Sequence, residues 1–212
     1  QVLRVEGEDY NHLPMQRLKG RRTVVMPTPD YHAVHHLFPK SSYGSFSTFI
    51  DLILGTVTPL AGRHVLLTGS RGAYGSEMKK TLERMGAIVE TAKSGLDFRA
   101  GYYEPVMAKL ERADILVLAH GTKYEDCWNA NYVTFVDLID RFKELGRDRL
   151  VPPEVWACGS EIEMFSDFPL EKFRAYVKSK HAFAQRASEY YRSDDLTYRP
   201  IAISSFTSRM GP

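Results

Sequence analysis

The segment TGSRGAYG, residues 68–75, constrains the fold of this chain more than any other feature of the sequence. It directly follows a short apolar run, HVLLTG, which predicts a buried strand, and it opens a segment with helical spacing. Its three glycines let the turn tighten and let the backbone approach a pyrophosphate that faces the helix N-terminus. A strand, a glycine loop and a helix in this order predict a dinucleotide-binding site, with a plain tight turn as the alternative.

Beyond residue 62, apolar runs alternate with segments of helical spacing. Strands are predicted at residues 64–69, 87–92, 114–121, 154–160 and 196–205, with a short additional strand at 95–98. Helices are predicted at residues 73–86, 102–113, 128–146 and 174–192. This alternation predicts an α/β fold, a Rossmann-like doubly wound parallel sheet of about six strands in the order 3-2-1-4-5-6. Ligands of such a sheet bind at the carboxyl ends of the strands.

The composition excludes several classes of protein. Hydrophobic residues make up 43% of the chain and charged residues 25%, values typical of a soluble globular protein. The net charge of +2 gives no strong field for nucleic acid, so no nucleic-acid partner is expected. Two cysteines, Cys127 and Cys158, are too few for a disulfide framework and indicate a reducing compartment. No apolar run approaches the roughly 20 residues of a membrane-spanning helix, and no signal peptide is expected.

Residues 1–62 differ from the rest of the chain. They are rich in proline, histidine and aromatic residues and lack a regular pattern. We therefore expect an N-terminal extension over residues 1–62 and an NAD(P)-binding Rossmann domain over residues 63–212. Because Gln1 is not an initiator methionine, we also expect the chain to be an excerpt of a longer protein.

The end of the second predicted strand bears on the choice of dinucleotide. A carboxylate there would bind the ribose hydroxyl of NAD, but Lys93 and Ser94 occupy that place and Glu90 falls within the strand. Together with Arg71 in the glycine loop, Lys93 favours the extra phosphate of NADP, with NAD left open and solvated surface charges as the alternative. Asp97 could bond the adenine amino group or cap a turn. The candidate cofactor-binding residues in this part of the chain are Thr68, Gly69, Ser70, Arg71, Gly72, Tyr74, Gly75, Lys93, Ser94 and Asp97.

The helix predicted at residues 174–192 carries a tyrosine and two lysines at its start. Residues four apart share a helix face, so Lys180 lies beside Tyr176 while Lys178 points away. A phenol has an ordinary pKa of about 10, and a nearby cation lowers that value. Such a tyrosine can exchange a proton with an alcohol or a ketone near neutral pH. The alternative is a half-buried tyrosine beside a lysine whose amine reaches solvent.

Taken together, TGxxGxxG and YxxxK in this order resemble the short-chain dehydrogenase/reductase family over about residues 63–206. The resemblance implies that Tyr176 is the general acid/base and that Lys180 holds the nicotinamide ribose and lowers the pKa of the tyrosine. It also implies a homodimer paired through the tyrosine-bearing helix and its neighbour. The usual seventh strand of the family is expected to be missing, and little chain remains for a substrate lid.

The same resemblance implies two further catalytic residues. Ser160, in WACGSE, takes the place of the serine that binds the substrate oxygen, with Ser166 as the alternative. Asn131, in NANYVTFVDL, takes the place of the asparagine that supports a proton relay, with Asn129 as the alternative. The resemblance therefore predicts a catalytic set of Ser160, Asn131, the tyrosine and the lysine.

Two more segments are compared with the family. LAHG resembles the segment beside the cofactor, where Ala119 and Gly121 would let the ring approach and His120 is expected to be a local hydrogen-bonding residue. After the last strand the family usually has a Pro-Gly pair that closes over the nicotinamide, and here Ser205 and Phe206 stand in that place. The second segment therefore departs from the family pattern.

Residues 30–56 closely resemble the last histidine motif and C-terminal tail of the fatty-acid hydroxylase/sterol desaturase superfamily, whose members are membrane enzymes with a di-metal centre. His32, His35 and His36 match its HxxHH element. Because the other histidine clusters are absent from this chain, no bound metal is expected, and the histidines are interpreted as partly exposed. A basic cluster at residues 17–22 would lie near a membrane surface or form a solvated loop.

The two resemblances together imply the soluble end of a bifunctional protein, a membrane hydroxylase followed by a reductase or dehydrogenase. The expected function is an NADP-dependent oxidoreductase that interconverts an alcohol and a carbonyl on an apolar small molecule such as a sterol, a fatty alcohol or an aldehyde. One alternative is a non-catalytic dinucleotide-binding module fused to a membrane hydroxylase. Another keeps the fold but makes the chain an epimerase or dehydratase. The expected location is the cytoplasm, or the cytoplasmic face of a membrane through an upstream domain.

Overall fold

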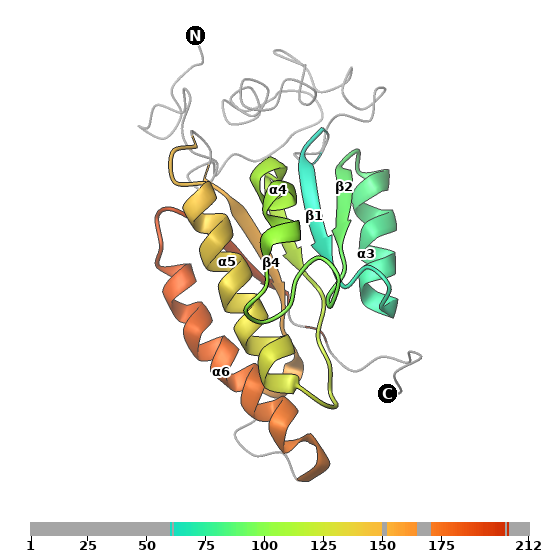
Figure 1. The fold of residues 1–212 in the computed structure, drawn as a ribbon, viewed down its shortest axis with the longest axis vertical. Coiled ribbons are helices and arrows are strands. Elements are labelled where there is room, and N and C mark those ends of the chain that lie inside the picture. Colours follow the sequence, from blue (N-terminus) through green and yellow to red (C-terminus); the bar gives the residue numbers. More distant parts are fainter. Residues whose placement is uncertain (1–59, 61, 150–151, 165–170, 202, 204–212) are drawn as a thin grey trace, which may run out of the picture.

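The computed structural model describes residues 60, 62–149, 152–164, 171–201 and 203, and Figure 1 shows their arrangement. Five parallel strands form one sheet in the order β2-β1-β3-β4-β5. The strands are β1 (His64–Thr68), β2 (Ile88–Ala92), β3 (Ile115–Leu118), β4 (Glu154–Cys158) and β5 (Thr197–Ile201). The helices are α3 (Ala73–Arg84), α4 (Glu104–Arg112), α5 (Thr134–Leu145) and α6 (Arg174–Tyr191). The predicted Rossmann-like α/β fold is confirmed.

Each face of the sheet buries its own apolar cluster, as expected for parallel strands covered on both sides. One cluster joins Leu66, Leu116 and Val155 of the sheet to residues of α4, α5 and α6. The other joins Val65 and Leu67 to Leu82 of α3 and to further buried residues. The strands therefore lie between α3 on one face and α4, α5 and α6 on the other, a doubly wound arrangement (Figure 1).

The short strand predicted at residues 95–98 is not formed. Ser94 and Phe98 make only an isolated bridge, so the described sheet has five strands rather than six. Gly95 turns the chain with φ +84°, and Asp97 accepts a hydrogen bond from the backbone of Lys93 at 2.7 Å, which closes a turn in place of a strand. Phe98 is fully buried, so its apolar character reflects core packing rather than a strand.

The long helix predicted at residues 128–146 has two parts. It begins as the π-helix η2 (Asn129–Val133) and continues as α5, which ends at Gly146 as expected. Insertions of this kind are frequent at functional sites, because the widened turn re-aims the side chains it carries. Asn131, at the centre of η2, is fully buried.

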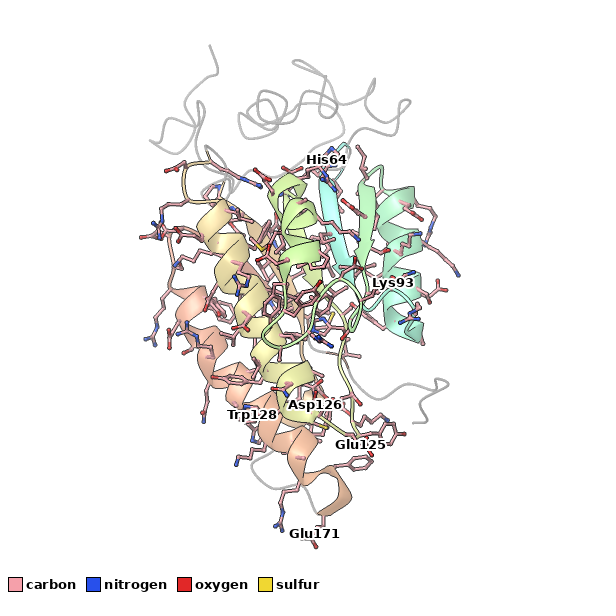
Figure 2. The ribbon with its side chains drawn as sticks, viewed as in Figure 1. His64, Lys93, Glu125, Asp126, Trp128 and Glu171 are labelled. Atoms are coloured by element: carbon pink, nitrogen blue, oxygen red, sulfur yellow. The ribbon has the colours of Figure 1, made fainter. Side chains whose placement is uncertain are left out.

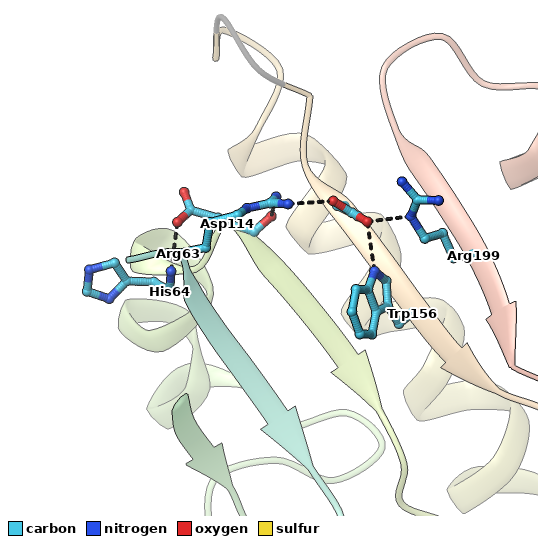
Figure 3. A network of polar contacts seen from close by, with 6 residues as sticks. Arg63, His64, Asp114, Trp156 and Arg199 are labelled. Atoms are coloured by element: carbon cyan, nitrogen blue, oxygen red, sulfur yellow. Dashed lines mark hydrogen bonds and ion pairs between the residues drawn. The ribbon is translucent and has the colours of Figure 1, made fainter. Parts of the chain in front are cut away.

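A polar network joins the strands at their amino ends (Figure 3). Glu154 accepts hydrogen bonds from Arg63 at 2.7 Å, from Trp156 at 2.8 Å and from Arg199 at 2.5 Å. Burial opposes ionisation of Glu154, but these donors together hold its pKa below the ordinary value. A buried charge pair that is satisfied in this way is costly to break, so the network fixes β1, β4 and β5 at the edge opposite the predicted site.

Among the described residues, no helix combines the length and the apolar character needed to cross a membrane.

Candidate functional site

The glycine loop lies against the carboxyl end of β3. Gly69 has φ +69°, and a Cβ added there would overlap the backbone of Ala119 and lie 2.5 Å from the nitrogen of His120. A Cβ at Gly75 would overlap the backbone of Gly69 itself. Both positions therefore require glycine, whereas Gly72 would meet only one atom, at 3.4 Å.

Helix α3 starts directly after this loop, and its N-cap residue, Gly72, has no side chain to cap the helix. The N–H groups of the first helical turn are thus not satisfied by a capping side chain, and the helix dipole is positive at that end. The start of α3 is therefore a place where an anion such as a pyrophosphate could bind, and the glycines let the loop pack tightly beside it.

A hydrogen-bonded chain runs behind the loop. Thr68 donates to the carbonyl of Val117 at 3.1 Å, and His120 joins the hydroxyls of Thr68 at 2.8 Å and Thr134 at 2.9 Å. Burial and the charge of Lys180 lower the pKa of His120 to about 3, so the ring stays neutral. In the neutral ring one nitrogen donates its hydrogen bond and the other accepts, so His120 can join both hydroxyls without a charge. His120 thus links the loop to α5, as the expected local hydrogen-bonding residue.

The end of β2 is exposed and basic. Lys93 and Ser94 follow the strand, Arg71 projects from the exposed glycine loop, and Figure 2 labels Lys93 on the side of the sheet where α3 begins. Glu90 lies within β2 and pairs with Arg112 at 3.1 Å, as expected from its early position. No described carboxylate therefore directly follows β2 in the place where NAD-binding sheets carry one.

Asp97 is occupied by the chain itself. One oxygen accepts from the backbone of Lys93, and the other accepts from the amine of Lys109 at 3.0 Å. Burial opposes its ionisation, but these donors hold its pKa below the ordinary value. Of the two roles considered for Asp97, the geometry supports the turn cap.

Of the two candidate asparagines, Asn131 is the one that reaches α6. Its amide nitrogen donates to Thr122 at 2.8 Å and to the hydroxyl of Ser179 at 3.1 Å, and its oxygen accepts from the backbone of Thr122 at 2.9 Å. A Cβ at Gly121 would lie 2.6 Å from that oxygen. Asn129 instead donates to Asp126 near the surface at 2.7 Å. Asn131 therefore fixes the loop after β3 to the helix that carries the tyrosine.

Asn131→Ala is expected to lower the free energy of unfolding by about 2 kcal/mol, because it leaves buried donors and acceptors without partners. Asn129→Ala removes one exposed hydrogen bond and is expected to cost about 0.5 kcal/mol or less. Urea denaturation of the two variants measures the difference. Equal costs at the two positions would contradict the role of Asn131.

Ser160, Tyr176 and Lys180 come together at the carboxyl end of β4. The hydroxyl of Ser160 faces the phenol of Tyr176 as a hydrogen-bonding partner. Lys180 is buried, with 5% of its surface exposed, and donates to the carbonyl of Cys158 at 3.1 Å. Lys178 is exposed and lies over the ring of Trp128, so it points away as predicted.

The pKa of Tyr176 shifts in the direction opposite to the expected one. Burial and the charge of Glu163 raise its pKa, and the hydrogen bond of Ser160 opposes them. The expected lowering by Lys180 is not seen, because the lysine amine is directed to the Cys158 carbonyl. Burial also lowers the pKa of Lys180, against the opposing charge of Glu163. In the cofactor-free chain the phenol is thus held protonated.

Two further side chains lie at this site: Tyr74, predicted only as a cofactor-binding residue, and Glu163, which was not predicted from the sequence. Tyr74, at the start of α3, faces the thiol of Cys158, and burial together with Cys158 raises the pKa of the phenol to about 12. Since β3 separates β1 from β4, this phenol extends across the end of β3. Glu163, in the 3₁₀-helix η3 (Glu161–Met164), accepts from the backbone of Ser160 at 3.0 Å. The signal in the sequence that could have identified Glu163 was Gly159, because the missing side chain leaves room for the Glu163 carboxylate.

Several predicted residues lie outside the described part of the chain. They are Ser166, Ser205, Phe206, the basic cluster at residues 17–22 and the histidines His32, His35 and His36. Within the described part, no group of three or more His, Cys, Asp or Glu side chains is arranged to hold a metal ion.

The fold is that of solved short-chain dehydrogenases. A short-chain dehydrogenase from Shigella flexneri in complex with NADP superposes with a TM-score of 0.58 and 16% identity, over 71% of this chain and 81% of that chain. The RhlG protein of Pseudomonas aeruginosa in complex with NADP gives 0.55 and 22%, over 71% and 75%. A 3-alpha-hydroxysteroid dehydrogenase from Pseudomonas sp. in complex with NADH gives 0.55 and 20%, over 69% and 74%.

One curated relative is similar in sequence. The monoglucosyldiacylglycerol epimerase of Synechocystis sp. is 23% identical over 86% of this chain and 50% of that protein. The chain thus spans about half the length of this relative. No model of a known protein family matches the sequence.

Proposed function

We propose that this chain is an NAD(P)-dependent oxidoreductase that interconverts an alcohol and a carbonyl. The observation that carries the proposal is the arrangement of Ser160 facing Tyr176, with buried Lys180 one helical turn further along. These side chains lie at the same carboxyl edge of the sheet as the glycine loop, where doubly wound folds bind their ligands. The NAD(P) complexes of the solved structures with this fold support the choice of cofactor.

The residues fit a bound dinucleotide. Gly69 and Gly75 let the loop pack directly against the backbone behind it, and the start of α3 offers N–H groups to a phosphate. Arg71 and Lys93 place two cations near the expected ribose, which favours NADP. The nicotinamide, when bound, would accept or supply a hydride at the carbon of the substrate.

Tyr176, Ser160 and Lys180 each have a separate role in the proposed proton transfer. Tyr176 gives a proton to the carbonyl oxygen during reduction, or takes it from the alcohol during oxidation. Ser160 orients that oxygen by hydrogen bonding, and the ammonium of Lys180 stabilises the phenolate that forms. In the reductive direction the protonated phenol of Tyr176 is the form that reacts, and in the oxidative direction it is the phenolate.

The similarity to a monoglucosyldiacylglycerol epimerase favours a second candidate function. In this function the chain inverts a hydroxyl-bearing carbon of the sugar in a glycolipid. Such a reaction removes a hydride from the carbon and a proton from its hydroxyl, then returns the hydride to the opposite face of the ketone. The same tyrosine takes the proton and gives it back, so no net oxidation occurs. The lipid part of this substrate agrees with the apolar small molecule expected from the sequence.

The proposal for the full-length protein extends to its location. The resemblance of residues 30–56 to a hydroxylase tail supports an upstream membrane domain, which would place this chain at the cytoplasmic face of a membrane. The bifunctional arrangement and a homodimer remain predictions. Native mass and detergent dependence of the full-length protein would test both.

Turnover assays on the full-length protein distinguish the candidates. We expect NADPH oxidation with long-chain aldehydes or ketosteroids if the chain is a reductase. If the chain is an epimerase, we expect it to convert monoglucosyldiacylglycerol with no net change in cofactor absorbance. Chromatography of the sugar released from the lipid would detect this conversion. Tight dinucleotide binding without any turnover would instead favour the non-catalytic module and overturn the proposal.

A further inference from the structure

The site contains a carboxylate that the proposed mechanism does not use. Glu163 lies in η3, which directly follows the loop that carries Ser160, and its Oε1 accepts from the Ser160 N–H at 3.0 Å. A Cβ at Gly159 would lie 2.8 Å and 2.9 Å from its two oxygens, so the chain lacks a side chain where the carboxylate enters. Glu163 is thus built into the loop rather than directed to solvent.

Charged and titratable groups from three elements surround this carboxylate. Burial raises the pKa of Glu163, whereas Lys180 and His181 of α6 and the Ser160 N–H favour its ionised form. Its charge in turn raises the pKa of Tyr176 and helps keep Lys180 protonated. Two further titratable groups lie nearby. Tyr198 on β5 is close enough for the charge of Glu163 to raise its pKa, and Cys158 on β4 lies beside Lys180.

We infer that Glu163 is a positioning residue of this site, whose carboxylate orients the Ser160 backbone and whose charge sets the pH range in which Tyr176 and Lys180 work. The inference rests on the proposed function. It assigns to Glu163 two separable effects, one through a hydrogen bond and one through charge. A neutral amide at the same place keeps the first effect and removes the second.

Three variants separate these effects. Glu163→Gln keeps an acceptor for the Ser160 N–H but removes the negative charge, and Glu163→Ala removes both. Glu163→Asp keeps the charge on a shorter side chain and serves as the conservative variant. Glu161→Gln makes the same change of charge two residues away on the same 3₁₀-helix and is the matched control.

The expected result for Glu163→Gln follows from the sign of the lost charge. An anion stabilises both the neutral phenol of Tyr176 and the ammonium of Lys180, so its removal lowers both pKa values. Both limbs of the pH profile of kcat/KM then move to lower pH. On the acid limb of alcohol oxidation, where a phenolate is required, the rate at fixed pH rises several-fold.

Glu163→Ala is expected to lower kcat about tenfold at every pH, in addition to the same shift, because the Ser160 N–H loses its acceptor. Because it keeps the charge, Glu163→Asp is expected to leave both limbs of the pH profile of kcat/KM at their wild-type positions. The inference would be overturned if both limbs of the pH profile of kcat/KM stayed in place in Glu163→Gln. It would also be overturned if Glu161→Gln shifted those limbs equally.

A second measurement needs no turnover. NMR titration of the full-length protein labelled with carbon-13 at the tyrosine Cζ, assigned by comparison with Tyr176→Phe, follows the phenol of Tyr176 in the absence of cofactor. We expect its titration to move to lower pH in Glu163→Gln and to stay in place in Glu161→Gln. This shift without turnover by the wild-type protein would establish the effect of the Glu163 charge on Tyr176 and remove the proposed function. Turnover with an unmoved titration would do the reverse.

Discussion

Tyr176→Phe is expected to lower kcat for the alcohol–carbonyl reaction by a factor of about 10² to 10⁴, with the affinity for the dinucleotide unchanged. The phenylalanine ring keeps the volume of the side chain, so the packing of α6 is retained. Only the hydroxyl that faces Ser160 and exchanges the proton is lost. The loss is therefore in chemistry and not in binding or folding.

The matched control for this variant is Tyr191→Phe on the same helix. Tyr191 is 59% exposed and lies at the far end of α6, so removal of its hydroxyl is expected to leave turnover within a factor of about two. Steady-state kinetics, dinucleotide binding by fluorescence and urea denaturation measure the three properties separately. Unchanged turnover in Tyr176→Phe would remove the tyrosine from the mechanism.

Gly69→Ala is expected to cost about 3 kcal/mol or more of folding free energy and to weaken dinucleotide binding about 100-fold or more. Two effects combine at this position. An alanine is strained at φ +69°, and its Cβ would overlap the backbone of Ala119, which cannot rotate away like a side chain. Relief requires the loop to leave the end of β3, and this displaces the N–H groups that would contact the pyrophosphate.

Gly101→Ala isolates the first of these effects. Gly101 has φ +76°, and an added Cβ would meet nothing within 4 Å. We expect a cost of about 1–2 kcal/mol from backbone strain and no change in dinucleotide affinity. Denaturation and binding measurements on both variants give the comparison. Equal losses of stability and affinity in the two variants would show that close approach at Gly69 is unimportant.

The order of strands and helices was predictable because apolar periodicity records which faces are buried. HVLLTG and DILVLAHG each have a continuous apolar centre, as expected of strands covered on both faces, and these centres form β1 and β3. The pattern at 95–98 misled because a single buried residue, Phe98, gives a four-residue segment the appearance of a strand. Short runs carry too few positions to separate core packing from sheet pairing.

The candidate site was predictable only in its local part. Helical spacing placed Lys180 on the same face as Tyr176, and the structure buries that lysine. The sign of the pKa shift at Tyr176 was wrong, because it depends on burial and on the distant carbonyl of Cys158 that binds the lysine. Glu163 was missed because its role arises from the turn between Ser160 and η3, which spacing along the chain does not encode.

The ionic network around Glu154 has a consequence for how this protein can diversify. It fixes the starts of β1, β4 and β5, while every loop of the candidate site leaves from the other ends of the strands. Changes of specificity can therefore accumulate in the segments after β2, β3 and β4 without loosening the sheet beneath them. Laboratory evolution directed to those loops would therefore leave the contacts that stabilise the sheet unchanged, because these contacts lie a full strand length away.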